Sequence, residues 1–323
     1  MRQLLSIVLI ILISGCTTFG GYLPSTPGEK ASGYSYIPLD GLAVDQKSYA
    51  DSCKRLMEKR NEQQSYNLME YDFLPIKDSF PDISVRFAVG SFDTNGGLVY
   101  GPAKVTEKYK EYRAILDYVN VDEMPVTFWI TTFSEGRSLS PGMVGIYRKI
   151  NRYEEGRILT YKVKLAVEYD DEGNPSDIPQ PDPNSEEVTF PVYVGIGMRL
   201  SADIQAIEGG ATLTSLGAIG LEAQAKHLTG TLTVQTIGIS GENIGSSLPL
   251  PSNLDQSTIE NAILAIGSIR AVMYSANNQS NQLFTPRVVG LYSPIGSAPA
   301  LINAIYSELS KTRPGWPRPC KSH

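Results

Sequence analysis

Apolar and polar residues alternate along two long stretches in the middle of the chain. In residues 159–169, Leu, Tyr and Val alternate mainly with Thr, Lys and Glu; in residues 188–205, every even-numbered position is apolar. A period of two is typical of β-strands, so both stretches are predicted as strands, joined into a long hairpin by the acidic, proline-rich segment 170–187. The second stretch is longer than a usual strand and has to bend, and Gly195 and Gly197 offer sites for a bulge or a sheet corner.

Shorter patterns predict the remaining elements. Further strands are expected near residues 83–89, 109–119, 125–131, 229–239 and 283–293, with 93–97 as a turn. Helical spacing of apolar residues predicts helices over 45–63, 257–277 and 298–310, while 213–226 fits a helix or a strand equally well.

The helix predicted over 257–277 has the clearest signals. Ser257 and Glu260 have the spacing of a capping box, and the apolar residues Ala262, Ile266 and Ile269 (with Met273) follow at helical spacing. Strands and helices together predict an α+β fold, with mostly antiparallel β-sheets, a long hairpin and about three amphipathic helices.

The N-terminus predicts a cleaved signal segment. Met1-Arg2-Gln3 supplies a positive charge, Leu4 to Ile13 supply about ten apolar residues, and small residues precede Cys16. The apolar run is about half the length that spans a bilayer. Ile13-Ser14-Gly15-Cys16 resembles the lipobox of bacterial lipoproteins.

That resemblance implies cleavage before Cys16 and acylation of its thiol and its new amino group, palmitate being one of the acyl groups expected. Thr17, in place of the Asp associated with inner-membrane retention, favours the outer membrane, with the periplasmic face preferred over the cell surface. The alternative is an ordinary secretory signal in which Cys16 is incidental.

The domain organisation follows from these signals. Residues 1–15 are predicted as the signal peptide, 16–44 as a flexible tether rich in Gly, Ser, Thr and Pro, 45–312 as a single β-rich α+β domain, and 313–323 as a Pro-rich tail. If Cys16 is acylated, Cys53 and Cys320 remain and are predicted to form a disulfide, the alternative being a buried helical Cys53.

Composition narrows the function classes. The net charge of −6 disfavours nucleic acid as a partner. Two histidines, no phosphate-binding loop and no nucleophile motif give no basis for a catalytic residue or a cofactor; a Ser-His-Asp site would depend on His227. The acidic segment with Asp170, Asp171, Glu172 and Asp177 is a weak Ca²⁺ candidate, for which a solvated loop is the simpler explanation.

Three functional hypotheses remain. The first is a lipid-anchored, non-enzymatic scaffold or binding module of the cell envelope, with a protein or glycan partner. The second is a subunit of an oligomeric outer-membrane export or pore complex, in which each copy contributes the hairpin of residues 159–169 and 188–204. The third is an envelope hydrolase, and homo-oligomerisation stays open in all three.

Overall fold

The computed structural model describes the core of the chain in separate segments. They are residues 34–45, 74–80, 82–92, 98–100, 110–134, 137–138, 159–166, 182–211, 213–240, 252–273, 284–294, 299–316 and 318. Within these residues the fold is α+β: ten strands form one sheet in which every pairing between named strands is antiparallel, and three α-helices pack on it.

The strands are β1 (Tyr34–Ala43), β2 (Asp82–Phe92), β3 (Leu98–Tyr100), β4 (Glu111–Ser134), β5 (Arg137–Ser138), β6 (Leu159–Leu165), β7 (Glu186–Ala206), β8 (Leu228–Ile237), β9 (Ser252–Asn253) and β10 (Arg287–Pro294). The helices are α5 (Leu216–Gln224), α7 (Gln256–Met273) and α8 (Pro299–Lys311), with a short 3-10 turn at Ile76–Asp78. The main strand order is β1-β10-β7-β4-β2-β3.

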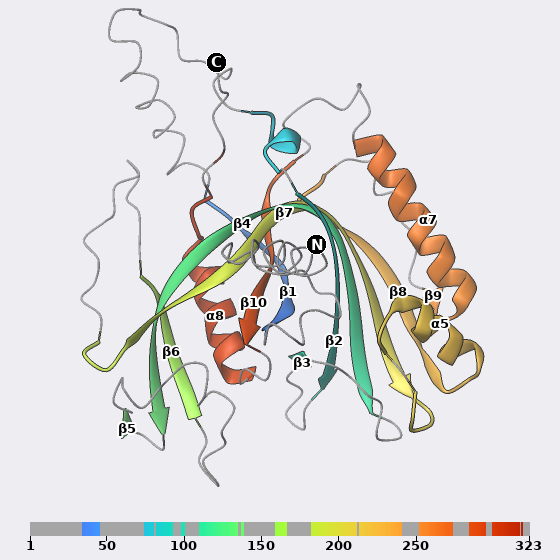
Figure 1. Ribbon diagram of the computed structural model, residues 1–323, viewed down its shortest axis with the longest axis horizontal. Coiled ribbons are helices and arrows are strands. Elements are labelled where there is room, and N and C mark those ends of the chain that lie inside the picture. Colours follow the sequence, from blue (N-terminus) through green and yellow to red (C-terminus); the bar gives the residue numbers. More distant parts are fainter. Residues whose placement is uncertain are drawn as a thin grey trace, which may run out of the picture.

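Strands β4 and β7 form the centre of the sheet. They pair along twenty successive positions, from Glu111↔Gln205 to Ile130↔Glu186, and arch together across the molecule (Figure 1). The other edge of β4 pairs first with β2 and, further along the strand, with β6. The other edge of β7 pairs with β10 and, further along the strand, with β8. The segments predicted as separate strands near 109–119 and 125–131 are therefore one continuous strand.

The predicted hairpin of residues 159–169 and 188–204 is not the pairing observed. Strand β6 and strand β7 each pair with β4, which lies between them. Alternation along one strand shows which side is buried but carries no information about the partner strand, so the prediction was wrong. The β4–β7 register is uninterrupted at Gly195 and Gly197, so no bulge interrupts this pairing there.

Glycine at these positions instead allows close packing of β7 on β4. A Cβ atom on Gly195 or Gly197 would collide with the backbone carbonyl oxygen of Asn120 or Tyr118. Both glycines therefore allow the two central strands to bend and remain paired.

The middle of β7 is buried on both faces. Its even-numbered residues from Val188 to Ile204 belong to the main core, as the alternation predicts. On the opposite face, Tyr193 and Arg199 are buried as well, while Asp203 and Gln205 near the end of the strand are exposed.

The helices lie in two places. Helices α5 and α7 pack against each other beside β8, and α8 packs against β6 (Figure 1). The ambiguous segment 213–226 thus contains a helix. In α7 the predicted stripe residues Ala262, Ile266 and Ile269 are buried, but Ile263 and Leu264 are exposed, so its outer face is not uniformly polar.

Both chain ends depart from the predicted organisation. Residues 34–43, assigned to the tether 16–44, form β1, whose residues Tyr36 to Leu39 are buried. In the Pro-rich tail, Trp316 is fully buried, stacks on Phe80 at 4.8 Å between ring centroids, and donates a hydrogen bond from Nε1 to Asp122. Local Gly and Pro content predicted loops because it does not report these distant apolar contacts.

Candidate functional site

A row of polar side chains crosses one face of the sheet. Cross-strand register places Arg86 of β2 opposite Asp117 of β4, Asp117 opposite Arg199 of β7, and Arg199 opposite Gln235 of β8. Residues directly opposite one another in a sheet share a face, so the four side chains form one ladder. Arg86, Asp117 and Arg199 are buried, and Gln235 is exposed at the end of the row.

Arg199 and Asp117 form a bidentate ion pair. Nε and Nη2 of Arg199 donate to the two carboxylate oxygens of Asp117 at 2.6 and 2.7 Å. Arg199 also donates to the backbone carbonyls of Leu39 in β1 (2.8 Å) and Val289 in β10 (2.9 Å). Burial lowers the pKa of Arg199, but the attraction to Asp117 and the hydrogen bonds to its carboxylate outweigh this effect, so the pKa is raised and the charge is kept.

Three tyrosine rings surround Arg86. Its guanidinium carbon lies 4.3 Å from the ring centre of Tyr193, 5.3 Å from that of Tyr292 and 5.8 Å from that of Tyr36, distances at which a cation is attracted to aromatic rings. Arg86 donates to the Tyr292 hydroxyl at 2.6 Å, while its buried Nε has no hydrogen-bond partner among the described residues.

The tyrosine hydroxyls connect the ladder to neighbouring strands. Tyr36 of β1 donates to Asp117 at 2.6 Å, and Tyr193 donates to Glu123 at 2.7 Å. Burial raises the pKa of Tyr36 and of Tyr193, so both are neutral donors at physiological pH. The buried polar cluster (Tyr36, Arg86, Asp117, Tyr193, Arg199 and Tyr292) therefore attaches β1 and β10 to the face of β2, β4 and β7.

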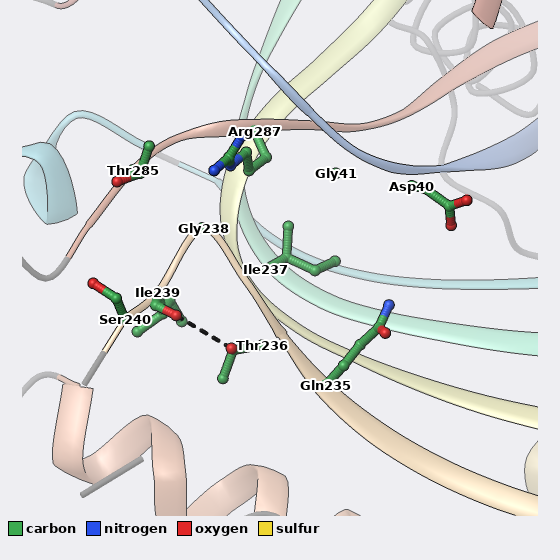
Figure 2. Close-up of a pocket in the computed structure, with 10 residues that line it drawn as sticks. All are labelled: Asp40, Gly41, Gln235, Thr236, Ile237, Gly238, Ile239, Ser240, Thr285 and Arg287. Atoms are coloured by element: carbon green, nitrogen blue, oxygen red, sulfur yellow. Dashed lines mark hydrogen bonds between the residues drawn. The ribbon is translucent and has the colours of Figure 1, made fainter. Parts of the chain in front are cut away.

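A recess of about 530 Å³ opens next to this cluster. Its walls come from three parts of the chain: Asp40 and Gly41 of β1, residues 235–240 at the end of β8, and Thr285 and Arg287 at the start of β10 (Figure 2). We refer to these residues as the recess.

The described lining of the recess contains one acidic and one basic residue, Asp40 and Arg287. In Figure 2, Asp40 and Arg287 lie on opposite sides of Gly41, and the Gln235 amide extends toward the Asp40 side. The Asp40 side chain is 89% exposed and lies 3.9 Å from Nη1 of Arg199, which is at the limit of an ion pair. Arg287 is partly buried and has no carboxylate within ion-pair distance among the described residues.

The floor of the recess depends on one glycine in a left-handed conformation. Gly238 has φ = +66°, and a Cβ atom there would collide with the carbonyl oxygen of Thr285. The Thr285 amide donates to the Gly238 carbonyl at 2.8 Å, and Ile239 bridges to Phe284. These contacts hold the end of β8 against the segment entering β10, so the recess is shaped by backbone contacts.

Most sequence-predicted site residues fall outside the part of the chain that the structure describes. Cys16, Cys53, Cys320 and the acidic residues Asp170, Asp171, Glu172 and Asp177 are outside the described residues. Within the described segments, His, Cys, Asp and Glu side chains form no group suited to holding a metal ion.

His227, the residue on which a hydrolase would depend, sits between α5 and β8. Its Nδ1 lies 2.8 Å from Glu222, and its Nε2 lies 3.7 Å from Glu208. The ring is 43% exposed, and among the described residues its polar side-chain contacts are with these two glutamates, not with a serine or cysteine. Two acidic neighbours are an ordinary surface arrangement for a histidine.

Sequence reasoning missed the ladder and the recess. A partial signal existed: Arg199 interrupts the small or apolar residues that flank it on the odd-numbered face of β7, and Asp117 lies within an otherwise apolar strand segment. Charged residues at such positions are buried only when they are paired, but the pairing partner is set by strand order.

No described helix has the length and hydrophobicity needed to cross a bilayer. Comparisons with protein-family models, with curated proteins and with solved structures found no match.

Proposed function

We propose that the protein is a lipid-anchored, non-enzymatic binding module of the cell envelope, and that the recess is its ligand site. The observation that carries the proposal is Arg287, a cation in a 530 Å³ concavity without an ionic partner among the described residues. A concave site with a few converging polar groups is the usual form of a ligand pocket. The lipobox resemblance supplies the anchoring to the outer membrane.

The lining indicates the ligand chemistry. Arg287 suits a carboxylate, Asp40 suits an amine or hydroxyl, and Gln235 can both donate and accept hydrogen bonds. The described lining residues include no aromatic ring on which a sugar could stack. A segment with both carboxylate and amine groups, such as the peptide stem of peptidoglycan, therefore fits better than a neutral polysaccharide.

Binding of full-length, detergent-solubilised protein to isolated peptidoglycan and to its soluble peptide-bearing fragments tests this proposal. The Arg287→Gln variant is expected to weaken binding roughly 10- to 150-fold, since a charge-assisted hydrogen bond is worth about 1.5–3 kcal/mol. Asp40→Asn is expected to weaken binding of amine-bearing fragments.

Lys162→Gln and Glu187→Gln, exposed residues of β6 and β7 outside the recess, serve as charge-matched controls and should bind as the parent protein does. Equal affinity of the Arg287→Gln variant and the parent protein, or no binding to any fragment, would contradict the proposal. No described feature favours the pore or hydrolase hypotheses over this one.

A further inference from the structure

Strand β2 has an open edge. One of its edges pairs with β4 from Asp82 to Ser91. On the other edge, β3 pairs only with Gly90 to Phe92, so residues 82–89 have no strand partner among the described residues. Outward-pointing backbone N–H and C=O groups along such an edge are a template for another strand.

The exposed side chains of this edge are apolar. Ile83 and Val85 are 52% and 53% exposed, although Ser84 and Arg86, on the opposite face, are buried. Three features with which natural edge strands avoid partners do not occur within residues 82–89: there is no lysine, no proline and no interruption of the register with β4. A fourth, an inward-pointing charge, is present as the buried Arg86. This edge is therefore suited to pairing.

We infer that β2 pairs antiparallel with β2 of a second copy of this chain, joining two sheets across a two-fold axis. The pattern is self-complementary: with Val85 opposite Val85, Ile83 faces Phe87 of the other copy, and all three are uncharged. Arg86, the only basic residue of the segment, is turned into its own tyrosine cluster, so no exposed like charges meet. A two-fold pairing closes on itself and leaves no second open β2 edge.

Interface size suggests where this dimer forms. The eight residues of the paired segment span roughly 26 Å at 3.3 Å per residue. An interface made by one strand from each copy buries a small area for a protein–protein contact, below about 1,200 Å². Such an interface is weak between freely diffusing molecules. Anchoring in one membrane raises the effective concentration of the two copies, and pairing is then expected on the membrane.

Photo-crosslinking of the full chain in its native membrane tests the pairing, independently of ligand binding in the recess. A photoreactive phenylalanine analogue replaces Ile83, and isotopically heavy and light copies are expressed together. The expected product has twice the mass of the chain and contains residues 82–92 of a heavy copy joined to the same region of a light copy. A product of any other mass, or none, overturns the inference.

A matched pair of variants completes the test. Val85→Lys in the same photoreactive chain places like charges opposite each other and should reduce the two-copy product at least tenfold, roughly 1.4 kcal/mol. Leu264→Lys adds the same charge to an apolar α7 residue that is 69% exposed and should leave the product unchanged. Equal loss in both variants, or loss in neither, overturns the inference, and the heavy–light product remains decisive if Val85→Lys does not fold.

Discussion

At the scale of single residues, Asp117 holds the buried polar cluster together. It is fully buried, accepts two hydrogen bonds from Arg199 and one from Tyr36, and faces Arg86 across the strand pair. Without its charge, two buried arginines would remain near each other in a region of low dielectric constant. Water cannot compensate for this loss, because the side chain has no exposed surface.

We therefore predict that Asp117→Asn lowers the free energy of unfolding by about 3–5 kcal/mol, the cost of leaving a buried charge without its partner. Chemical denaturation followed by circular dichroism measures the change. The control is Asp203→Asn, which breaks the ion pair with Arg113 between side chains that are 54% and 41% exposed. Its expected cost is below about 1 kcal/mol, and similar losses for both variants would show that Asp117 has no special role.

At the scale of the element, the residue that caps the start of α7 lies two positions before the cap predicted from the sequence. The predicted capping box at Ser257 and Glu260 is wrong, since the helix begins at Gln256 and Asp255 caps it. Oδ1 of Asp255 accepts from the Thr258 amide at 2.8 Å, and Oγ1 of Thr258 accepts from the Asp255 amide at 3.1 Å. Asp is as good an N-cap as Ser, so both registers fit the sequence.

Asp255→Ala is expected to lower the midpoint of thermal unfolding by roughly 2 °C at pH 7. The hydrogen bond from the Thr258 amide lowers the pKa of Asp255, so its stabilising effect is present above the unfolded-state pKa of about 3.9 and is lost as the pH falls through the lowered value. Thermal unfolding at pH 7 and pH 2.5 checks both statements. Ser257→Ala is the control and should have the smaller effect, while a loss that persists at pH 2.5 would argue against the carboxylate cap.

At the scale of the whole molecule, the two ends of the folded chain meet. Asp45 exchanges backbone hydrogen bonds with the tail, donating to Pro314 and accepting from Trp316, and Arg318 donates to the Leu74 carbonyl. Asp45 and Leu74, which flank the part of the chain that contains Cys53, thus both contact the described tail. The Cys53–Cys320 disulfide stays a prediction, since both cysteines lie outside the described residues.

Acylation of Cys16 is expected to hold the protein at the membrane. Cys16→Ser should move nearly all of the protein from the membrane fraction to the soluble fraction, because a single apolar run of about ten residues is too short to anchor the chain. Fractionation of cells and mass spectrometry of the N-terminal peptide provide the measurement. Cys53→Ser is the control and should remain with the membrane; an unacylated Cys16 in the parent protein would remove the anchor from the proposal.

Much of the fold was accessible from the sequence alone. Local patterns identified the α+β class, the strands β7, β8 and β10, the helices α7 and α8, and the buried even-numbered face of β7, because side-chain periodicity reflects burial directly. Residue identity and order alone also provide the lipobox resemblance, the number and positions of the cysteines, and the absence of catalytic motifs.

Tertiary structure alone decided which strands pair, and with that the candidate site. The placement of β4 between β2 and β7 brings Arg86, Asp117 and Arg199 into one ladder, and the folding of β1 and β10 over it creates the recess beside Arg287. Residues 40, 117, 199, 235 and 287 are far apart in the chain. Strand order depends on the packing of the entire sheet, and no local pattern contains that information.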